Sequence, residues 1–97
     1  HLLCYESGHV VWYNSQGIQK TVKLNGPVQH ALWNGQQASW HIAGWREEAC
    51  ISKLEHRSNT LNEIPMQIVV HNDSTMLLLN NGTFSESAYP ISSQAEE

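Results

Sequence analysis

The sequence predicts an all-β fold, an antiparallel meander of about seven or eight short strands. Turn signals recur at short intervals in its first part, at Ser7-Gly8, Gln16-Gly17, Asn25-Gly26-Pro27 and Asn34-Gly35. Asn and Gly both tolerate positive φ, so these stretches favour tight hairpin turns. The runs between the turns are short and rich in β-branched and aromatic residues, which is typical of strands.

The first predicted strands lie between these turns, at residues 2–5, 9–13, 18–24 and 28–33. In the third of them, apolar Ile, Val and Leu alternate with Gln, Thr and Lys, as in a strand with one buried face. The alternation is imperfect, because Lys20 falls on the apolar side.

The middle of the chain is less regular. Residues 37–42 are predicted to form a strand. Residues 45–54 fit either a helix, with Trp45 and Ala49 on one face, or a strand; we favour the strand because both neighbouring segments are predicted strands. Residues 57–62 are predicted to form a loop.

The last predicted hairpin consists of residues 66–71 and 75–79. Pro65 stands at the first position of this hairpin's first strand, where a missing N–H is tolerated. From residue 85 onward the chain is polar and shows no apolar period. The sequence therefore predicts one antiparallel β domain over residues 1–84 and a flexible polar tail or linker over residues 85–97.

One stretch resembles a known family. Trp12-Tyr13-Asn14-Ser15-Gln16-Gly17, with the strand 28–33 that follows, resembles a blade junction of a WD-repeat-type β-propeller. In that family a strand ends in Trp-Asp, a turn with Gly and an outer strand follow, and a Gly-His loop leads into the next inner strand. Here Tyr13 replaces the Asp, and Asn25-Gly26-Pro27 contains no His, so the repeat is degenerate. The stretch is also similar to the divergent N-terminal propellers of the largest anaphase-promoting complex subunits.

This resemblance implies that the chain is part of a larger propeller. A blade takes about 40 to 45 residues, so 97 residues correspond to about two blades, which cannot close a ring. The first residue, His1, is not Met, which also indicates a cut piece or a processed product. The alternative architecture is a small closed β-barrel or a β-sandwich.

Composition argues against several classes of partner. The net charge is −4 with only five basic residues, so we expect no nucleic-acid partner. No apolar run reaches the length of a membrane span, so we expect no membrane partner.

No motif indicates catalysis, a metal or a cofactor. The six histidines and two cysteines show no metal-ligand spacing. Cys4 and His9, with Cys50 or another histidine, could form a site, and one strand register would bring Cys4, His9 and Cys50 together. We therefore expect no enzyme activity, no resident metal and no cofactor.

The four tryptophans are the most informative residues. Trp12 and Trp33 lie within predicted strands and are expected in the core. Trp40 and Trp45, with Arg46 beside them, are the candidate binding residues, because they could form a platform for a peptide or a sugar.

The sequence thus favours a non-enzymatic scaffold that binds protein partners within a complex. It would be intracellular, with the nucleus as one candidate compartment. The alternative is a secreted, glycan-binding β-sandwich that uses Trp40 and Trp45. Sequons at Asn72 and Asn81 favour that alternative, and a disulfide between the two cysteines would support it.

Overall fold

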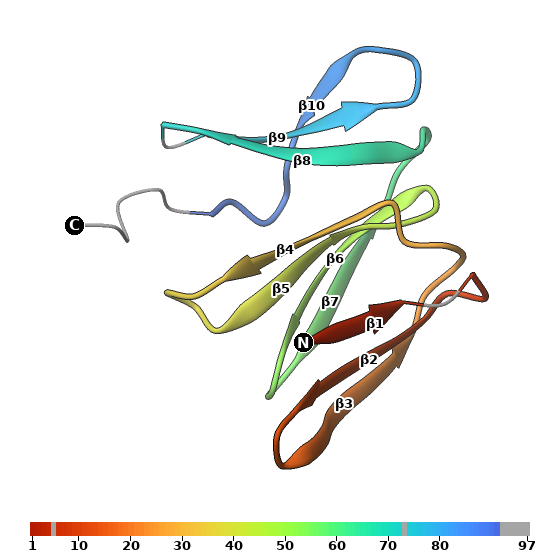
Figure 1. The fold of residues 1–97 in the computed structure, drawn as a ribbon. Helices are drawn as coiled ribbons and strands as arrows, with labels where there is room; N and C mark the ends of the chain where they lie inside the picture. The colour runs from red at the N-terminus through yellow and green to blue at the C-terminus, as the bar shows by residue number, and fades with distance from the viewer. Residues whose placement is uncertain (5, 73, 92–97) are drawn as a thin grey trace.

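The computed structural model describes residues 1–4, 6–72 and 74–91, which form ten strands in three antiparallel sheets (Figure 1). The first sheet contains β1 (Leu2–Cys4), β2 (His9–Asn14) and β3 (Gly17–Lys23). The second sheet contains β4 (His30–Asn34), β5 (Ser39–Ala43), β6 (Glu47–Ser52) and β7 (His56–Thr60). The third sheet contains β8 (Pro65–His71), β9 (Ser74–Leu79) and β10 (Phe84–Glu86).

The three sheets are stacked in chain order, with the second sheet between the other two (Figure 1). Within each sheet, strands that are consecutive in sequence are neighbours in space. The molecule measures 39 × 37 × 17 Å. The prediction of an all-β antiparallel fold is confirmed, but the described strands number ten, in three sheets, and not about seven or eight. The part of the chain that the structure describes contains neither a helix nor a closed barrel.

The first interface joins the first and second sheets and is mainly apolar. Its buried residues are Val10, Trp12, Val22, Leu24, Ile42, Ala49 and Ile51. Trp12 lies in this core as predicted. Lys20, opposite Trp12 in the register, extends its Nζ to donate a hydrogen bond to the Ser52 carbonyl oxygen at 2.8 Å. A lysine on the apolar side is therefore tolerated because its ammonium reaches a backbone acceptor.

The second interface joins the second and third sheets. Its buried apolar residues are fewer: Ala43, Ile68 and Leu77, with Leu32, Leu61 and Leu79 packed against them. The backbone N–H of Ile68 donates a 2.8 Å hydrogen bond to Nδ1 of His30, which ties β8 to β4. The two interfaces use opposite faces of the same strands, since side chains alternate along β5 and β6.

The residues of β6 form a strand, so the helical interpretation of 45–54 is wrong and the favoured one is confirmed. Five of its six residues are buried, because each face of β6 is covered by a neighbouring sheet. Residues 57–62 differ from the prediction, since residues 57–60 belong to β7 and not to a loop. All residues of β7 are exposed, so this strand has no buried face and its sequence shows no alternation of apolar and polar residues. The backbone of β7 nevertheless pairs with β6.

The first residues of the predicted polar tail, 85–91, are packed against the rest of the molecule. Ser85 and Glu86 belong to β10, and Ile91 is buried. Thr75 and Ile91 exchange hydrogen bonds, with Ile91 N–H donating to Thr75 Oγ1 at 2.7 Å. Residues 85–91 thus pack against the sheets through contacts that composition does not reveal. Residues 92–97 lie outside the described residues.

Candidate functional site

Three tryptophans from the first two sheets meet between these sheets, at the end of β4 and β5 where their turn joins them. Trp33 and Trp40 lie directly opposite each other across β4 and β5, with ring centroids 5.2 Å apart. Trp12 of β2 meets Trp33 edge to face at 5.8 Å. Such tilted and edge-to-face pairs are favoured aromatic geometries. These residues are the tryptophan cluster.

The cluster borders an open cavity of about 950 Å³, the tryptophan hollow. The residues that line it are His1, Trp12, Asn14, Trp33, Gln37, Ala38, Trp40, Ser52, Lys53 and Leu54. Two of the large apolar side chains remain accessible, since Trp33 is 44% exposed and Leu54 is 95% exposed. A hollow of this size, with aromatic walls and a few polar groups, has the character of a ligand site.

The charges around the hollow have one sign. Lys53 is among the lining residues, and no lining residue is an aspartate or a glutamate. Lys20 comes within 2.8 Å of the carbonyl of Ser52, another lining residue. Among the residues that line the hollow, the charged side chain is thus a lysine, in a chain whose net charge is −4.

Two buried hydrogen-bond donors lie at the same end of the hairpin β4–β5. Trp40 Nε1 and Asn34 Nδ2 have no acceptor among the residues that the structure describes. The Asn34 side-chain oxygen is occupied, because it accepts from the backbone N–H groups of Gln36 and Gln37. A buried donor without an acceptor costs about 1–3 kcal/mol. Both donor atoms are enclosed, and Asn34 is not among the residues that line the hollow.

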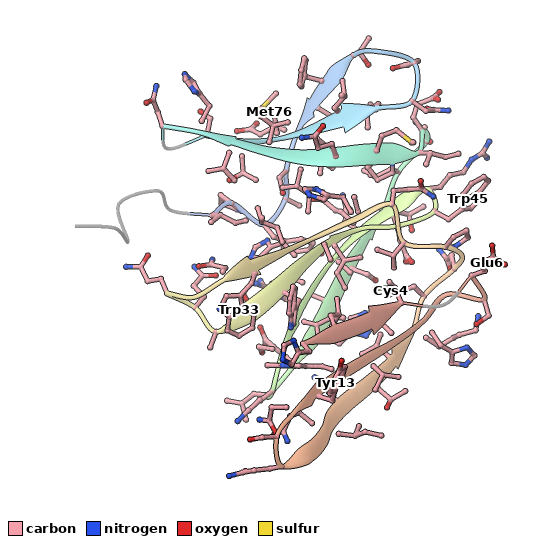
Figure 2. All side chains as sticks on the ribbon, in the orientation of Figure 1. Cys4, Glu6, Tyr13, Trp33, Trp45 and Met76 are labelled. Atoms are coloured by element: carbon pink, nitrogen blue, oxygen red, sulfur yellow. The ribbon has the colours of Figure 1, made fainter. Side chains whose placement is uncertain are left out.

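The structure separates the residues predicted to form one platform. Trp40 belongs to the tryptophan cluster, whereas Trp45 and Arg46 lie in the turn after β5, at the opposite end (Figure 2). Four residues, 41–44, lie between Trp40 and Trp45, three of them in β5, and a strand rises about 3.3 Å per residue. The peptide or sugar platform of Trp40 with Trp45 and Arg46 is therefore not assembled.

Trp45 packs against the loop that joins the first two sheets. It is 42% exposed, and its Cβ would lie only 2.8 Å from a Cβ added to Gly26. The glycine after Asn25 thus allows the indole to lie against the backbone of the loop between the first two sheets.

Trp33 was expected in the core and is instead half exposed. A signal for its pairing with Trp40 was present, because the two residues are equally distant from the middle of the turn that Asn34-Gly35 begins. Hairpin symmetry of this kind places residues opposite each other before any tertiary contact is known.

The structure does not bring together Cys4, His9 and Cys50, the three residues considered as metal ligands. Cys4 lies on β1 of the first sheet, whereas Cys50 lies on β6 and faces the third sheet, with its Sγ 3.9 Å from Nε2 of His41. Both thiols are free, and burial raises the pKa of the Cys4 thiol. Within residues 1–4, 6–72 and 74–91, no three His, Cys, Asp or Glu residues are grouped so that they could hold a metal ion.

The buried pair of His41 and Cys50 faces the third sheet. His41 Nε2 also lies 3.4 Å from Ser39 Oγ, and burial lowers the pKa of the imidazole. Both side chains are almost fully covered, so the arrangement offers no access for a substrate.

Comparisons with known proteins found no matching family model, no matching curated protein and no matching solved structure. In the described ranges, no helix has the length and apolar character needed to span a membrane.

Proposed function

We propose that this chain is a non-enzymatic scaffold module, a segment of a β-propeller-like subunit that holds protein partners within a larger assembly. The observation that carries the proposal is the contrast between the second sheet, which has a sheet against each face, and the third sheet, whose outward face meets no other described sheet and carries the exposed Phe84.

The outward face of the third sheet carries four apolar side chains, those of Val69, Met76, Leu78 and Phe84. In the register, the polar Gln67, His71, Ser74 and Glu86 lie on the same face. In the register, Val69 lies opposite Met76, and Leu78 lies opposite Phe84. Met76 points away from the second sheet (Figure 2), and Phe84 is 58% exposed. An antiparallel sheet with one solvated face normally presents polar residues there, so the four apolar side chains give part of this face the character of an interface.

The first sheet has a similar outward face at the other end of the stack. Val11 and Tyr13 alternate with the buried Val10 and Trp12, and Ile18 opposite Tyr13 is 68% exposed. The outward faces of the first and third sheets therefore both carry apolar side chains that a further sheet could cover. The occupant that fits them is a further antiparallel sheet, packed as the three sheets of this chain pack on one another.

The order of strands supports the same proposal. Sheets of three, four and three strands follow each other along the chain, as a partial blade, a whole blade and a second partial blade would. This agrees with the resemblance of residues 12–33 to a junction between blades of a WD-repeat-type propeller.

An intracellular location, with the nucleus as one candidate, is part of this proposal. The two free thiols favour a reducing compartment. The alternative, a secreted glycan-binding domain, derives support from the exposed Asn72 and Asn81. It is the weaker proposal because Trp40 and Trp45 do not form the platform on which it relied.

Self-association of the chain tests the proposal. We expect the chain to associate as its concentration rises and to bind a dye specific for exposed apolar surface, because its end faces are uncovered. Met76→Lys combined with Phe84→Lys is expected to reduce both signals while the circular dichroism spectrum stays unchanged.

Ser58→Lys, on the exposed β7, is the matched control, because it adds a charge away from these faces. A wild-type chain that remains monomeric and binds no dye at the highest attainable concentration would contradict the proposal.

A further inference from the structure

The fold encloses the three Asn-Gly pairs of the sequence to different degrees. These pairs are Asn25-Gly26, Asn34-Gly35 and Asn81-Gly82. The side-chain amide of an asparagine can be attacked by the backbone nitrogen of the next residue, and a glycine permits this attack most readily because it has no Cβ. The reaction needs the nitrogen and the amide carbon in contact, so it depends on the freedom of the backbone around the pair.

We propose that Asn81 is a site of spontaneous deamidation, at which the side-chain amide becomes a carboxylate through a succinimide formed with Gly82. The backbone nitrogen of Gly82 bonds to Cγ of Asn81, the Cγ–Nδ2 bond breaks, and ammonia leaves with the proton of the Gly82 amide. Water then opens the ring at one of its two carbonyl carbons. The products are aspartate and isoaspartate, and in isoaspartate the main chain runs through Cγ.

The turn that joins β9 to β10 leaves Asn81 and Gly82 open to this reaction. Both residues are exposed, and the turn projects away from the other two sheets (Figure 1). Apart from its chain neighbours, no described residue comes within 4 Å of a Cβ built on Gly82, whose φ is +87°. The Gly82 N–H donates to the Leu79 carbonyl oxygen at 2.9 Å, and this hydrogen bond must open before the attack. Opening an exposed turn requires little free energy.

Thr83 prepares the side-chain carbonyl of Asn81 for the attack. The backbone N–H of Thr83 donates to Oδ1 of Asn81 at 3.1 Å, and its hydroxyl donates to the same atom at 2.6 Å. Negative charge develops on Oδ1 when the nitrogen adds to Cγ. Two donors already aimed at Oδ1 therefore stabilise the tetrahedral intermediate.

The fold holds the other two pairs more tightly. Asn34 is 3% exposed, and its Oδ1 accepts from two backbone N–H groups of the turn that follows. Asn25 is exposed, but its backbone N–H donates to Glu47 Oε1 at 3.1 Å. Gly26 is buried, and a Cβ built on it would lie 2.8 Å from Cβ of Trp45. Reaction at either pair therefore requires a larger opening of the structure than reaction at the β9–β10 turn.

Isoaspartate at position 81 adds one atom to the main chain of the turn. In the unmodified chain the Leu79 N–H donates to the Thr83 carbonyl oxygen at 2.8 Å, and Phe84 lies opposite Leu78. Turn length sets the register of a hairpin, so we expect isoaspartate to weaken the pairing of β10 with β9. Phe84 also belongs to the outward face of the third sheet. A weaker association of the modified chain is therefore expected as well, and this last expectation rests on the proposed function.

The test incubates the folded 97-residue chain in mildly alkaline buffer and follows each Asn-Gly pair by peptide mass spectrometry. Conversion of an amide to a carboxylate adds about 1 Da, and electron-transfer fragmentation distinguishes aspartate from isoaspartate. We expect Asn81 to react at least tenfold faster than Asn25 or Asn34, or about 1.4 kcal/mol in the free energy of opening. In guanidinium chloride we expect the three rates to converge, because the unfolded chain encloses none of the pairs.

Variants separate the chemistry at Asn81 from general decay of the chain. Asn81→Gln is expected to abolish the reaction at this position, because attack on the longer side chain must form a less favoured six-membered ring. Asn25→Gln is the matched control, since it changes another exposed asparagine of an Asn-Gly pair and should leave the rate at Asn81 unchanged. Thr83→Val removes the hydroxyl donor and should slow the reaction about two- to tenfold. Thr83→Ser should restore the rate.

Hydrogen exchange tests the effect on the register. We expect the amides of β10 to exchange faster in the isoaspartate form, separated by chromatography, than in the unmodified chain. Unchanged exchange would overturn this effect. Equal rates at the three pairs of the folded chain, or a faster reaction at Asn25 or Asn34, would overturn the site itself. A Thr83→Val chain that reacts as fast as the wild type would overturn the part assigned to the hydroxyl. None of these measurements depends on self-association, so the modification site and the proposed function can fail separately.

Discussion

The first interface and the second interface stabilise the same central sheet by different means. The first is formed by Trp12 and aliphatic side chains around Ile42 and Ile51. The second has fewer apolar residues and buries His41, Glu48 and Thr75 with them. A single sheet thus presents an apolar face to one neighbour and a partly polar face to the other.

Glu48 shows how the polar interface is held together. Its carboxylate accepts from Ser87 Oγ at 2.9 Å, from the backbone N–H of Ala88 at 3.0 Å and from Asn59 Nδ2 at 3.4 Å. Arg57 lies 5.1 Å above the Tyr89 ring in the same segment. The stability of the first interface depends on the apolar area that it buries. The stability of the second interface depends on each buried donor having an acceptor.

The largest expected effect comes from breaking the first interface. Trp12→Ala is expected to lower the free energy of unfolding by about 3–5 kcal/mol, since it removes a buried indole and leaves a cavity. Urea denaturation measures the loss. Leu77→Ala makes the matching change at the second interface, with an expected cost of about 2–5 kcal/mol. A cost below about 1 kcal/mol for Trp12→Ala would contradict its place in the core.

Glu48→Ala breaks the polar interface and is expected to cost about 1–3 kcal/mol, because buried donors lose their acceptor. Residues 87–91 should also become more sensitive to limited proteolysis. Glu86→Ala, at an exposed glutamate of β10, serves as the control. Equal stability and equal proteolysis of the two variants would show that the Glu48 hydrogen bonds do not hold this segment.

The pH dependence of stability is expected to be smaller and confined to the second interface. Burial lowers the pKa of His41 below its ordinary 6.5, the backbone of Tyr89 partly opposes this, and the charge of Arg57 adds to it. The unfolded chain then binds a proton more readily than the folded one. The contribution of His41 is therefore complete above pH 6.5 and is lost as the pH falls toward the lower folded pKa.

Urea midpoints between pH 5 and 8, compared for the wild type and His41→Gln, measure this contribution. The wild type should lose stability below about pH 6.5, and the variant should lose less. Identical slopes for the two proteins would assign the pH dependence to other groups.

The smallest effect is expected for Trp45→Ala. This indole is half exposed and lies outside both interfaces, so the loss of unfolding free energy should stay below about 1 kcal/mol. Comparison with Trp12→Ala by the same urea assay separates a tryptophan of the core from one of the surface. Similar costs for the two variants would place Trp45 in a packed environment.

Local chemistry was sufficient to predict most strands and turns. Ser7-Gly8 indicates a turn, and Gly8 has a φ of +96° with no room for a side chain beside the Leu24 carbonyl. Alternation and turn residues are properties of a few adjacent positions, so they can be recognised without knowledge of the fold. The same holds for Pro65, which begins β8 as predicted.

Tertiary structure alone decided how the three sheets stack and what their contacts produce. β7 is a strand only through its backbone pairing with β6. Residues 87–91 pack only because they form hydrogen bonds with Glu48 and Thr75. Likewise, sheet stacking brings Trp12 to Trp33 while the length of β5 keeps Trp45 away. Such contacts depend on register and on the packing of faces distant in sequence, which no local pattern of residues encodes.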